Sequence, residues 1–202
     1  MKFFRNRNLF LVLAFSFVAF GVMGYHPGAE DDIIYVTAVK ADLNPALYPH
    51  DADFFKLQVK TSTFDTWMAA FIRETHIPVA WAELLWQFIS VFLIVLACWY
   101  IVSQLFPEDS ARWAGVAMVV AMFTLPVAGT ALYLVDQYMH PRNLATGLIL
   151  FAIARIMARK AWQAVPLVVV AFVLHPLMGA FGVSFCCVLA LTLYEPFYAS
   201  LR

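Results

Sequence analysis

Three consecutive acidic residues, Glu30, Asp31 and Asp32, are the group in this sequence best suited to chemistry. They follow an apolar run, residues 9–25, that is long enough to form a membrane helix. Carboxylates are costly to bring into hydrocarbon, so the cluster must lie in water or bind something at the bilayer surface. Two or three carboxylates there could hold a divalent cation through oxygen ligands, or one could act as a general base.

Further polar residues lie at the ends of later apolar segments or in the loops that join them. In the topology given below, the outer face also collects Asp136, His140, Arg142, His175, His50, Asp51 and Asp53. Arg142 and the histidines could meet a phosphate group, because guanidinium and imidazole groups donate hydrogen bonds to its oxygens. The alternative is that the acids are solvated and cap helices, and that His175 is a polar turn residue before a proline.

The composition is that of a membrane protein. Of the 202 residues, 63% are hydrophobic and 13% charged, whereas a soluble domain carries roughly a quarter charged residues. The apolar residues fall in long uninterrupted blocks, which is typical of membrane spans. The formal net charge is zero, which gives no electrostatic case for a nucleic-acid partner. Cys98, Cys186 and Cys187 lie in apolar runs and are predicted to be packing thiols.

We predict an all-α fold, in which residues 1–202 form a single membrane domain, a polytopic transmembrane bundle of about six spans. The predicted spans are residues 9–25, 81–105, 113–133, 143–158, 162–175 and 177–194. Pro126 and Gly129 are expected to kink the third span. The last two spans are predicted to meet in an outer hairpin at His175-Pro176; the alternative is one long broken helix and five spans in all.

Basic residues orient this bundle, because short cytoplasmic loops carry an excess of Lys and Arg. Only Arg142 lies in a short outer loop. The predicted inner residues are Lys2, Arg5, Arg7, Arg112, Arg155, Arg159, Lys160 and Arg202. We therefore expect an integral protein of a bacterial inner membrane with its N-terminus in the cytoplasm. The first apolar run is expected to be an uncleaved anchor; a signal peptide cleaved near Val22 or Gly24 is the alternative.

Residues 26–80 are predicted to form a long outer loop that contains amphipathic helices. Asp32 can cap a short helix over residues 33–41. The sequence Ser62-Thr63-Phe64-Asp65 has the form of a capping box with Asp in place of Glu. An apolar stripe follows at helical spacing, formed by Phe64, Trp67, Met68, Phe71 and Ile72. Such a helix should lie flat on the membrane or on the other spans.

This layout resembles the GT-C glycosyltransferases, with an N-terminal span, an acidic motif that opens a long outer loop, and a further acid in the next outer loop. The segments DDIIYVTAVKADLNPALYPHD, HPRNLATGLILFAIAR and LHPLMG also look like bacterial membrane proteins of GT-C-like layout. Members of this superfamily are polytopic enzymes that take sugars from polyprenyl-phosphate or polyprenyl-diphosphate donors. The resemblance therefore implies a membrane-embedded glycosyltransferase module with a lipid-linked sugar as donor.

The resemblance also implies roles for particular residues. Asp31 and Asp32 match the catalytic acid or acid pair of the first outer loop, and one of them would deprotonate an acceptor or help to hold a divalent metal ion. Glu30, beside them, and Asp136, in the second outer loop, match metal-binding positions. Arg142, together with His140 and His175, would bind the donor phosphate. Since such enzymes usually have more spans and often a C-terminal soluble domain, the chain would be an N-terminal portion, a smaller module or a non-catalytic relative.

Two other classes of function are alternatives to the enzyme. The first is a non-catalytic structural subunit of a larger membrane complex, which would dock onto other membrane subunits through residues 26–80, with Trp67 and Phe71 in the contact. Its partners would be those subunits, whereas the enzyme would meet membrane lipid and a polyprenyl-phosphate sugar. The second is a transporter or channel, which is disfavoured because no mid-membrane acid or base forms a relay.

Overall fold

A computed structural model describes residues 6–57, 59–126 and 133–193, and this part of the chain is all-helical, as predicted. An isolated bridge between Pro126 and Tyr133 is the one strand-like contact among these residues. The helices are α1 (Asn6–Met23), α2 (Asp32–Leu43), α3 (Ala52–Lys56), α4 (Phe64–Thr75), α5 (Val79–Leu105), α6 (Asp109–Ala121), α7 (Pro141–Met157), α8 (Ala164–Leu174) and α9 (Pro176–Leu193), with short 3-10 turns at Pro45–Leu47 and Ala161–Gln163.

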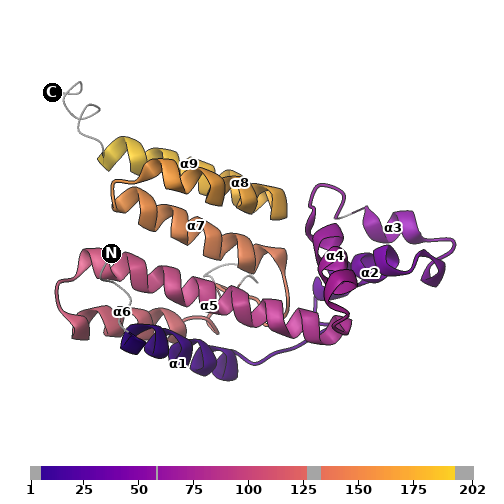
Figure 1. Ribbon diagram of the computed structural model, residues 1–202, viewed down its shortest axis with the longest axis horizontal. Helices are drawn as coiled ribbons and strands as arrows, with labels where there is room; N and C mark the ends of the chain where they lie inside the picture. Colours follow the sequence, from indigo (N-terminus) through magenta and orange to yellow (C-terminus); the bar gives the residue numbers. More distant parts are fainter. Residues whose placement is uncertain (1–5, 58, 127–132, 194–202) are drawn as a thin grey trace.

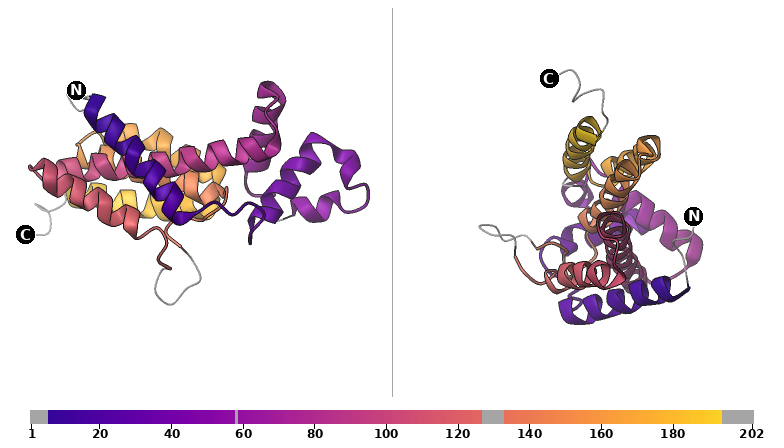
Figure 2. Two further views of the ribbon diagram at one scale, coloured as in Figure 1. Left: turned by 90° about the horizontal axis from the view of Figure 1, so that it is seen from below. Right: turned by 90° about the vertical axis from the view of Figure 1, so that its left-hand side faces the viewer.

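The helices form an elongated bundle with a separate lobe at one end (Figure 1). Helix α5 is central: it packs against α1, α6 and α7, and α7 packs in turn against α8 and α9. Helices α2, α3 and α4 form the terminal lobe (residues 32–75), which extends beyond the end where α5 begins (Figure 2). Buried apolar side chains of α1, α5 and α6 make the main core, in which the rings of Trp99 and Trp113 stack 4.0 Å apart.

Two of the described helices, α5 and α9, are long and apolar enough to cross a membrane. The segments Arg7–Met23 and Ala161–Leu174 are apolar but shorter. Large apolar side chains are exposed along α8 and α9, among them Val165, Val169, Phe172, Leu177, Phe181, Phe185 and Val188. Helix α5 covers the predicted span 81–105 because its apolar run continues for 27 residues without a proline or glycine.

The helix predicted over residues 113–133 is not continuous. Helix α6 ends at Ala121, and the chain then turns, with Leu125 N–H donating to the carbonyl of Met122. Pro126 would stop a helix at about Leu125, because proline disfavours helical backbone at the residue before it and has no N–H to donate; α6 ends earlier still, at Ala121. The 13 residues of α6 are only about 20 Å long at 1.5 Å per residue. The predicted kink at Gly129 falls on residues 127–132, outside the described part, as do the basic residues Lys2, Arg5 and Arg202.

Helices α8 and α9 form a hairpin, which favours the two-helix prediction over one long broken helix. A single extended residue, His175, separates them, and the two helices pack side by side. Gly179 makes this close approach feasible: a Cβ atom at that position would lie 2.3 Å from the Cα atom of Phe172. The turn is therefore as tight as the sequence His175-Pro176 suggests, since proline is well placed in the first turn of a helix.

The apolar stripe of α4 packs inside the protein. Phe64, Met68 and Ile72 are buried against α2, the start of α5 and Met139. The rings of Trp67 and Phe71 lie 4.4 and 5.5 Å from that of Trp86 on α5. Of the two predicted positions for this helix, the structure therefore has the one on another helix rather than the one on the membrane. The stripe is not a free docking surface.

Hydrogen bonds from the turn before α4 attach the terminal lobe to α8. The hydroxyl of Ser62 donates to the carbonyl of Leu174 (2.6 Å), and the N–H and hydroxyl of Thr63 donate to the carbonyl of Val173 (3.3 Å each). These carbonyls are at the C-terminal end of a helix, where they have no partner within the helix. Helix α4 begins at Phe64, one residue after the start that the predicted capping box implies, and the box does not form: Ser62 accepts from the N–H of Phe64 (3.1 Å) and Thr63 makes no side-chain cap.

Candidate functional site

The backbone before α2 directs its three acidic side chains to different places. Gly28 and Glu30 have φ angles of +80° and +46°, in the left-handed region, which is uncommon for a residue such as Glu. The Asp31 side chain is 62% exposed, whereas Asp32 is 1% exposed. Asp32 does not cap α2 in the predicted way, because its Oδ2 accepts a hydrogen bond from the N–H of Gly28 (2.5 Å). The two predicted catalytic acids therefore face different surroundings.

The segment 134–140, which follows the undescribed residues 127–132, is held in the bundle by two buried amides. Gln87 on α5 donates to the carbonyl of Asp136 (2.6 Å), and its Oε1 accepts from Asn143 on α7 (3.1 Å). The Oδ1 of Asn143 accepts from the N–H of Asp136 (3.0 Å), and its Nδ2 also lies within hydrogen-bond distance of the carbonyls of Asp136 and Tyr138. Both amides are 1% exposed or less. They fix the backbone that carries Asp136 and His140.

Asp136 and Arg142 form a buried ion pair. Arg142 Nε donates to Oδ2 of Asp136 (3.0 Å) and Arg142 Nη2 donates to Oδ1, so the pairing is bidentate. The Asp136 side chain is 3% exposed and that of Arg142 21%. Burial raises the pKa of Asp136, and the guanidinium of Arg142 opposes that rise. The pair keeps one edge of the guanidinium fixed beside His140.

His140 is a neutral imidazole whose proton position follows from its hydrogen bond. Its Nδ1 accepts from the backbone N–H of Arg142 (2.9 Å), so it caps α7 and the proton is on Nε2. That Nε2 lies 3.7 Å from Oδ2 of Asp31, close enough for attraction but longer than a hydrogen bond. Burial, with the positive charge of Arg142 and the neighbouring His175, lowers the pKa of His140 to about 3.

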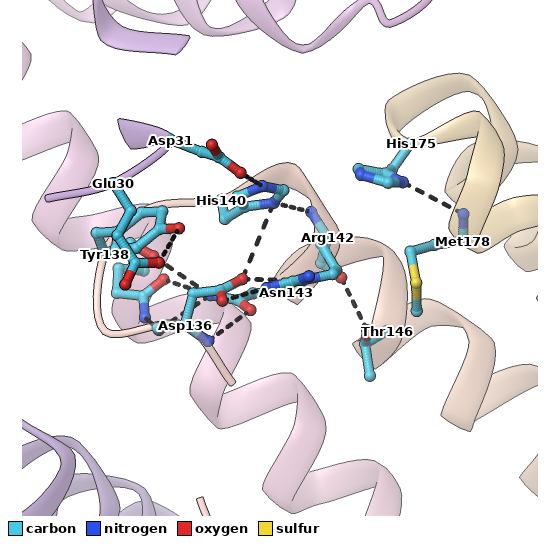
Figure 3. A network of polar contacts seen from close by, with 11 residues as sticks. Glu30, Asp31, Asp136, Tyr138, His140, Arg142, Asn143, Thr146, His175 and Met178 are labelled. Atoms are coloured by element: carbon cyan, nitrogen blue, oxygen red, sulfur yellow. Dashed lines mark hydrogen bonds and ion pairs between the residues drawn. The ribbon is translucent and has the colours of Figure 1, made fainter. Parts of the chain in front are cut away.

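His175 repeats this arrangement at the start of α9. Its Nδ1 accepts from the backbone N–H of Met178 (3.2 Å), and its ring centroid lies 5.7 Å from that of His140. Both histidines precede a proline that begins a helix, and Figure 3 shows the two rings on the same side of the ion pair. Glu30 completes the group, because its Oε2 accepts from the hydroxyl of Tyr138 (3.3 Å).

The structure thus brings most of the predicted site residues together. We call this group the outer cluster: Glu30, Asp31, Asp136, Tyr138, His140, Arg142 and His175. Asp32 is turned away from it, and Asp53 lies in the terminal lobe beside Lys56 and Lys60. No sequence motif indicates a role in the site for Asn143, Gln87 or Tyr138. An amide in an otherwise apolar run, as at Gln87, was the available signal, since a buried amide needs hydrogen-bond partners.

A divalent metal ion does not fit the contacts of Glu30 and Asp136. Both oxygens of Asp136 accept from Arg142, and Glu30 accepts from Tyr138. Among the residues that the structure describes, no group of three or more His, Cys, Asp or Glu side chains could hold a metal ion. The chemistry proposed below uses no metal.

Chemically, the outer cluster combines one open carboxylate with several hydrogen-bond donors. Asp31 is exposed and can accept a proton, while Arg142 and the Nε2–H groups of the two histidines can donate to an anion. The fold and the site together define an all-helical protein that carries a polar cluster at one end of an apolar helical bundle. Comparison of the chain with protein-family models, with curated proteins and with solved structures gives no match.

The pKa of His140 predicts a pH dependence of stability. The unfolded chain binds a proton on this residue near pH 6.5 and the folded protein only near pH 3, so stability should be lost as the pH falls below about 6.5. His140→Asn keeps the helix cap but does not titrate. Between pH 7 and pH 5 the variant should lose about 2 kcal/mol less unfolding free energy than the wild type.

Denaturant unfolding at a series of pH values measures this difference. His50→Asn, which replaces an exposed histidine of the terminal lobe, is the control and should follow the wild type. Parallel curves for His140→Asn and the wild type would show that His140 is protonated in the folded protein.

Proposed function

We propose that the chain is a membrane-embedded glycosyltransferase module of GT-C-like layout, which uses a lipid-linked sugar as donor. The observation that carries the proposal is the convergence of Asp31, His140, Arg142 and His175. They come from three segments far apart in the chain and meet as one carboxylate beside three donor groups. A transferase of this kind needs such a combination, because a base must stand next to a site for the leaving phosphate.

A polytopic membrane topology is part of the proposal, with six crossings and the N-terminus in the cytoplasm. Its support is the apolar surface of α8 and α9 and the length of α5. Helix α6 begins at the inner end and is short for a crossing, but Val135 packs with Val120 near the far end of α6, and the segment 134–140 leads from there to the outer cluster. Arg7 and Arg112 both contact Asp109 at the end opposite the terminal lobe (3.4 and 2.8 Å), where the rule for basic residues places the cytoplasm.

In the proposed reaction, Asp31 accepts the proton of an acceptor hydroxyl. The hydroxyl oxygen forms a bond to the anomeric carbon of the sugar, and the bond between that carbon and the phosphate oxygen breaks. The polyprenyl phosphate leaves with the electron pair and gains negative charge. Arg142 and the Nε2–H groups of His140 and His175 would stabilise that charge, since donors held in place lower the cost of developing charge.

We expect Asp31→Asn to lower sugar transfer by at least about 100-fold, the usual contribution of a general base. The assay would use proteoliposomes and a panel of polyprenyl-phosphate hexoses, with the full chain. Because Asp31 is exposed, the melting temperature should not change. Asp51→Asn, an exposed acid at the start of α3 that makes no side-chain cap, is the matched control and should keep full activity.

Transfer that survives Asp31→Asn would refute the role of this carboxylate. If no donor in the panel reacts and a stoichiometric membrane partner copurifies, the chain is instead a structural subunit of a larger complex. Such a partner would have to bind a surface other than the apolar stripe of α4, which is already packed against α2 and α5.

A further inference from the structure

A second polar site lies where Asp32 points, apart from the outer cluster. Asp32 and Glu83 line a groove of about 450 Å³ between α2 and the start of α5. Asp32 is 1% exposed and Glu83 is 7% exposed, yet Oδ1 of Asp32 and Oε1 of Glu83 have no hydrogen-bond partner among the residues that the structure describes. A buried carboxylate oxygen without a partner is costly, so both oxygens favour a ligand with hydrogen-bond donors.

The groove also has a positive side. Lys40 lines it and is exposed, and its charge acts on both Asp32 and Glu83. Burial raises the pKa of Asp32, and the N–H of Gly28 and the charge of Lys40 oppose this rise. The buried end of the groove therefore offers two carboxylates and its open end offers one ammonium group. A ligand that carries a positive and a negative group a few ångströms apart would complement both ends.

The two carboxylates suit an ammonium group of an organic ligand better than they suit a metal ion. No third His, Cys, Asp or Glu side chain stands beside the pair in the described part of the chain. The walls of the groove include Ile33, Val36 and Val79, which suit the carbon atoms of an organic ligand. A primary ammonium group has three N–H donors, enough to reach both unpaired oxygens.

An apolar groove on the same helix indicates where the rest of the ligand would lie. It measures about 320 Å³ and is lined by Phe17, Phe20, Trp81, Leu84, Leu85 and Phe88. Both grooves use the first turns of α5: Ala80 and Glu83 line the polar groove, and Trp81 and Leu84 line the apolar one. A polar headgroup site next to an apolar channel matches an amphiphile.

We propose that these two grooves bind a membrane phospholipid whose headgroup carries a primary ammonium and a phosphate. The ammonium would lie between Asp32 and Glu83, the phosphate near Lys40, and an acyl chain against Trp81 and Phe88. The inference uses the membrane location of the proposed function but not its transfer chemistry, so either can fail without the other.

The test is native mass spectrometry of the full chain, released from micelles that contain equal amounts of phosphatidylethanolamine, phosphatidylcholine and phosphatidylglycerol. We expect the ethanolamine lipid to be retained about tenfold more than the other two, because trimethylation or loss of the amine removes hydrogen bonds to charged groups. Asp32→Asn and Glu83→Gln should each reduce this preference, and the double variant should abolish it. Equal retention of the three lipids would overturn the proposal.

Two controls make the outcome specific. Asp65→Asn removes another buried acid with an unpartnered oxygen, which lines a different groove in the terminal lobe, and should leave the lipid preference unchanged. If the double variant does not fold, the two single variants decide, and an unchanged preference in both overturns the assignment.

Free phosphoethanolamine should bind at least about 100-fold more weakly than the lipid, since it lacks the apolar contacts. Equal binding of the free compound would assign the groove to a soluble ligand and overturn the lipid.

Discussion

Replacement of Arg142 by methionine is expected to lower the free energy of unfolding by about 3–5 kcal/mol. The substitution keeps an apolar side chain of similar length but removes the guanidinium that donates to both oxygens of Asp136. Asp136 is 3% exposed, so its carboxylate would be left buried without a counter-ion. Breaking one side of a buried pair costs more than the pair itself contributes, because the remaining charge has lost its hydration.

A double-mutant cycle and a pH series separate this cause from lost packing. Asp136→Asn combined with Arg142→Met removes both charges and should recover a large part of the stability. In Arg142→Met alone, burial raises the pKa of Asp136 with no guanidinium to oppose it, so the folded state binds the proton more tightly than the unfolded state. The loss should therefore be smaller at pH 5 than at pH 8. A pH-independent loss without recovery in the double variant would contradict the ion pair.

Gly179→Ala is expected to destabilise the protein by about 3 kcal/mol. The added Cβ atom would lie 2.3 Å from the Cα atom and 2.6 Å from the Cβ atom of Phe172. Backbone atoms cannot rotate away as a flexible side chain can, so α8 and α9 would have to separate. That separation would also displace His175 and the carbonyl of Leu174, which accepts from Ser62.

Gly21→Ala is the matched control for this prediction. Gly21 lies in α1, is exposed, and a Cβ atom there would have no neighbour within 4 Å. Alanine is a better helix former than glycine, so this variant should be stabilised by up to about 1 kcal/mol. Thermal and denaturant unfolding in the same detergent would compare the two. Equal effects from the two substitutions would mean that α8 and α9 do not approach as closely as described.

The sequence predicted the helices best where apolar character, or the helical spacing of apolar residues, continues over many residues. Helix α5 follows from one long apolar run, and the spacing of Phe64, Met68 and Ile72 predicted the helical stripe of α4. Its position against α2 and Trp86 did not follow, because an apolar stripe fits a lipid surface and a helix equally well. The end of α6 at Ala121 was missed because the residues between it and Pro126 remain apolar.

The candidate site was predicted as a set of residues but not as an arrangement. Asp31 and Asp32 are adjacent and chemically alike, and the left-handed backbone at Gly28 and Glu30 precedes the turn that separates them. Asp136 was predicted to bind a metal ion and Arg142 a phosphate, whereas the turn before α7 brings the two side chains together across six residues. The proton on Nε2 of His140 could not be assigned without the backbone N–H that its other nitrogen accepts.

The long-range hydrogen bonds described above have a consequence for biosynthesis. Ser62 and Leu174 are 112 positions apart, and Glu30 and Tyr138 are 108 apart. At a translation rate of 5–20 residues per second, the terminal lobe is made roughly 5–20 seconds before the helix to which it attaches. The contacts of the lobe with α8, and the outer cluster, can therefore form only when Leu174 and His175 have left the ribosome. Contacts of such high sequence separation form late and slowly, so the polar cluster cannot form until most of the chain has been synthesised.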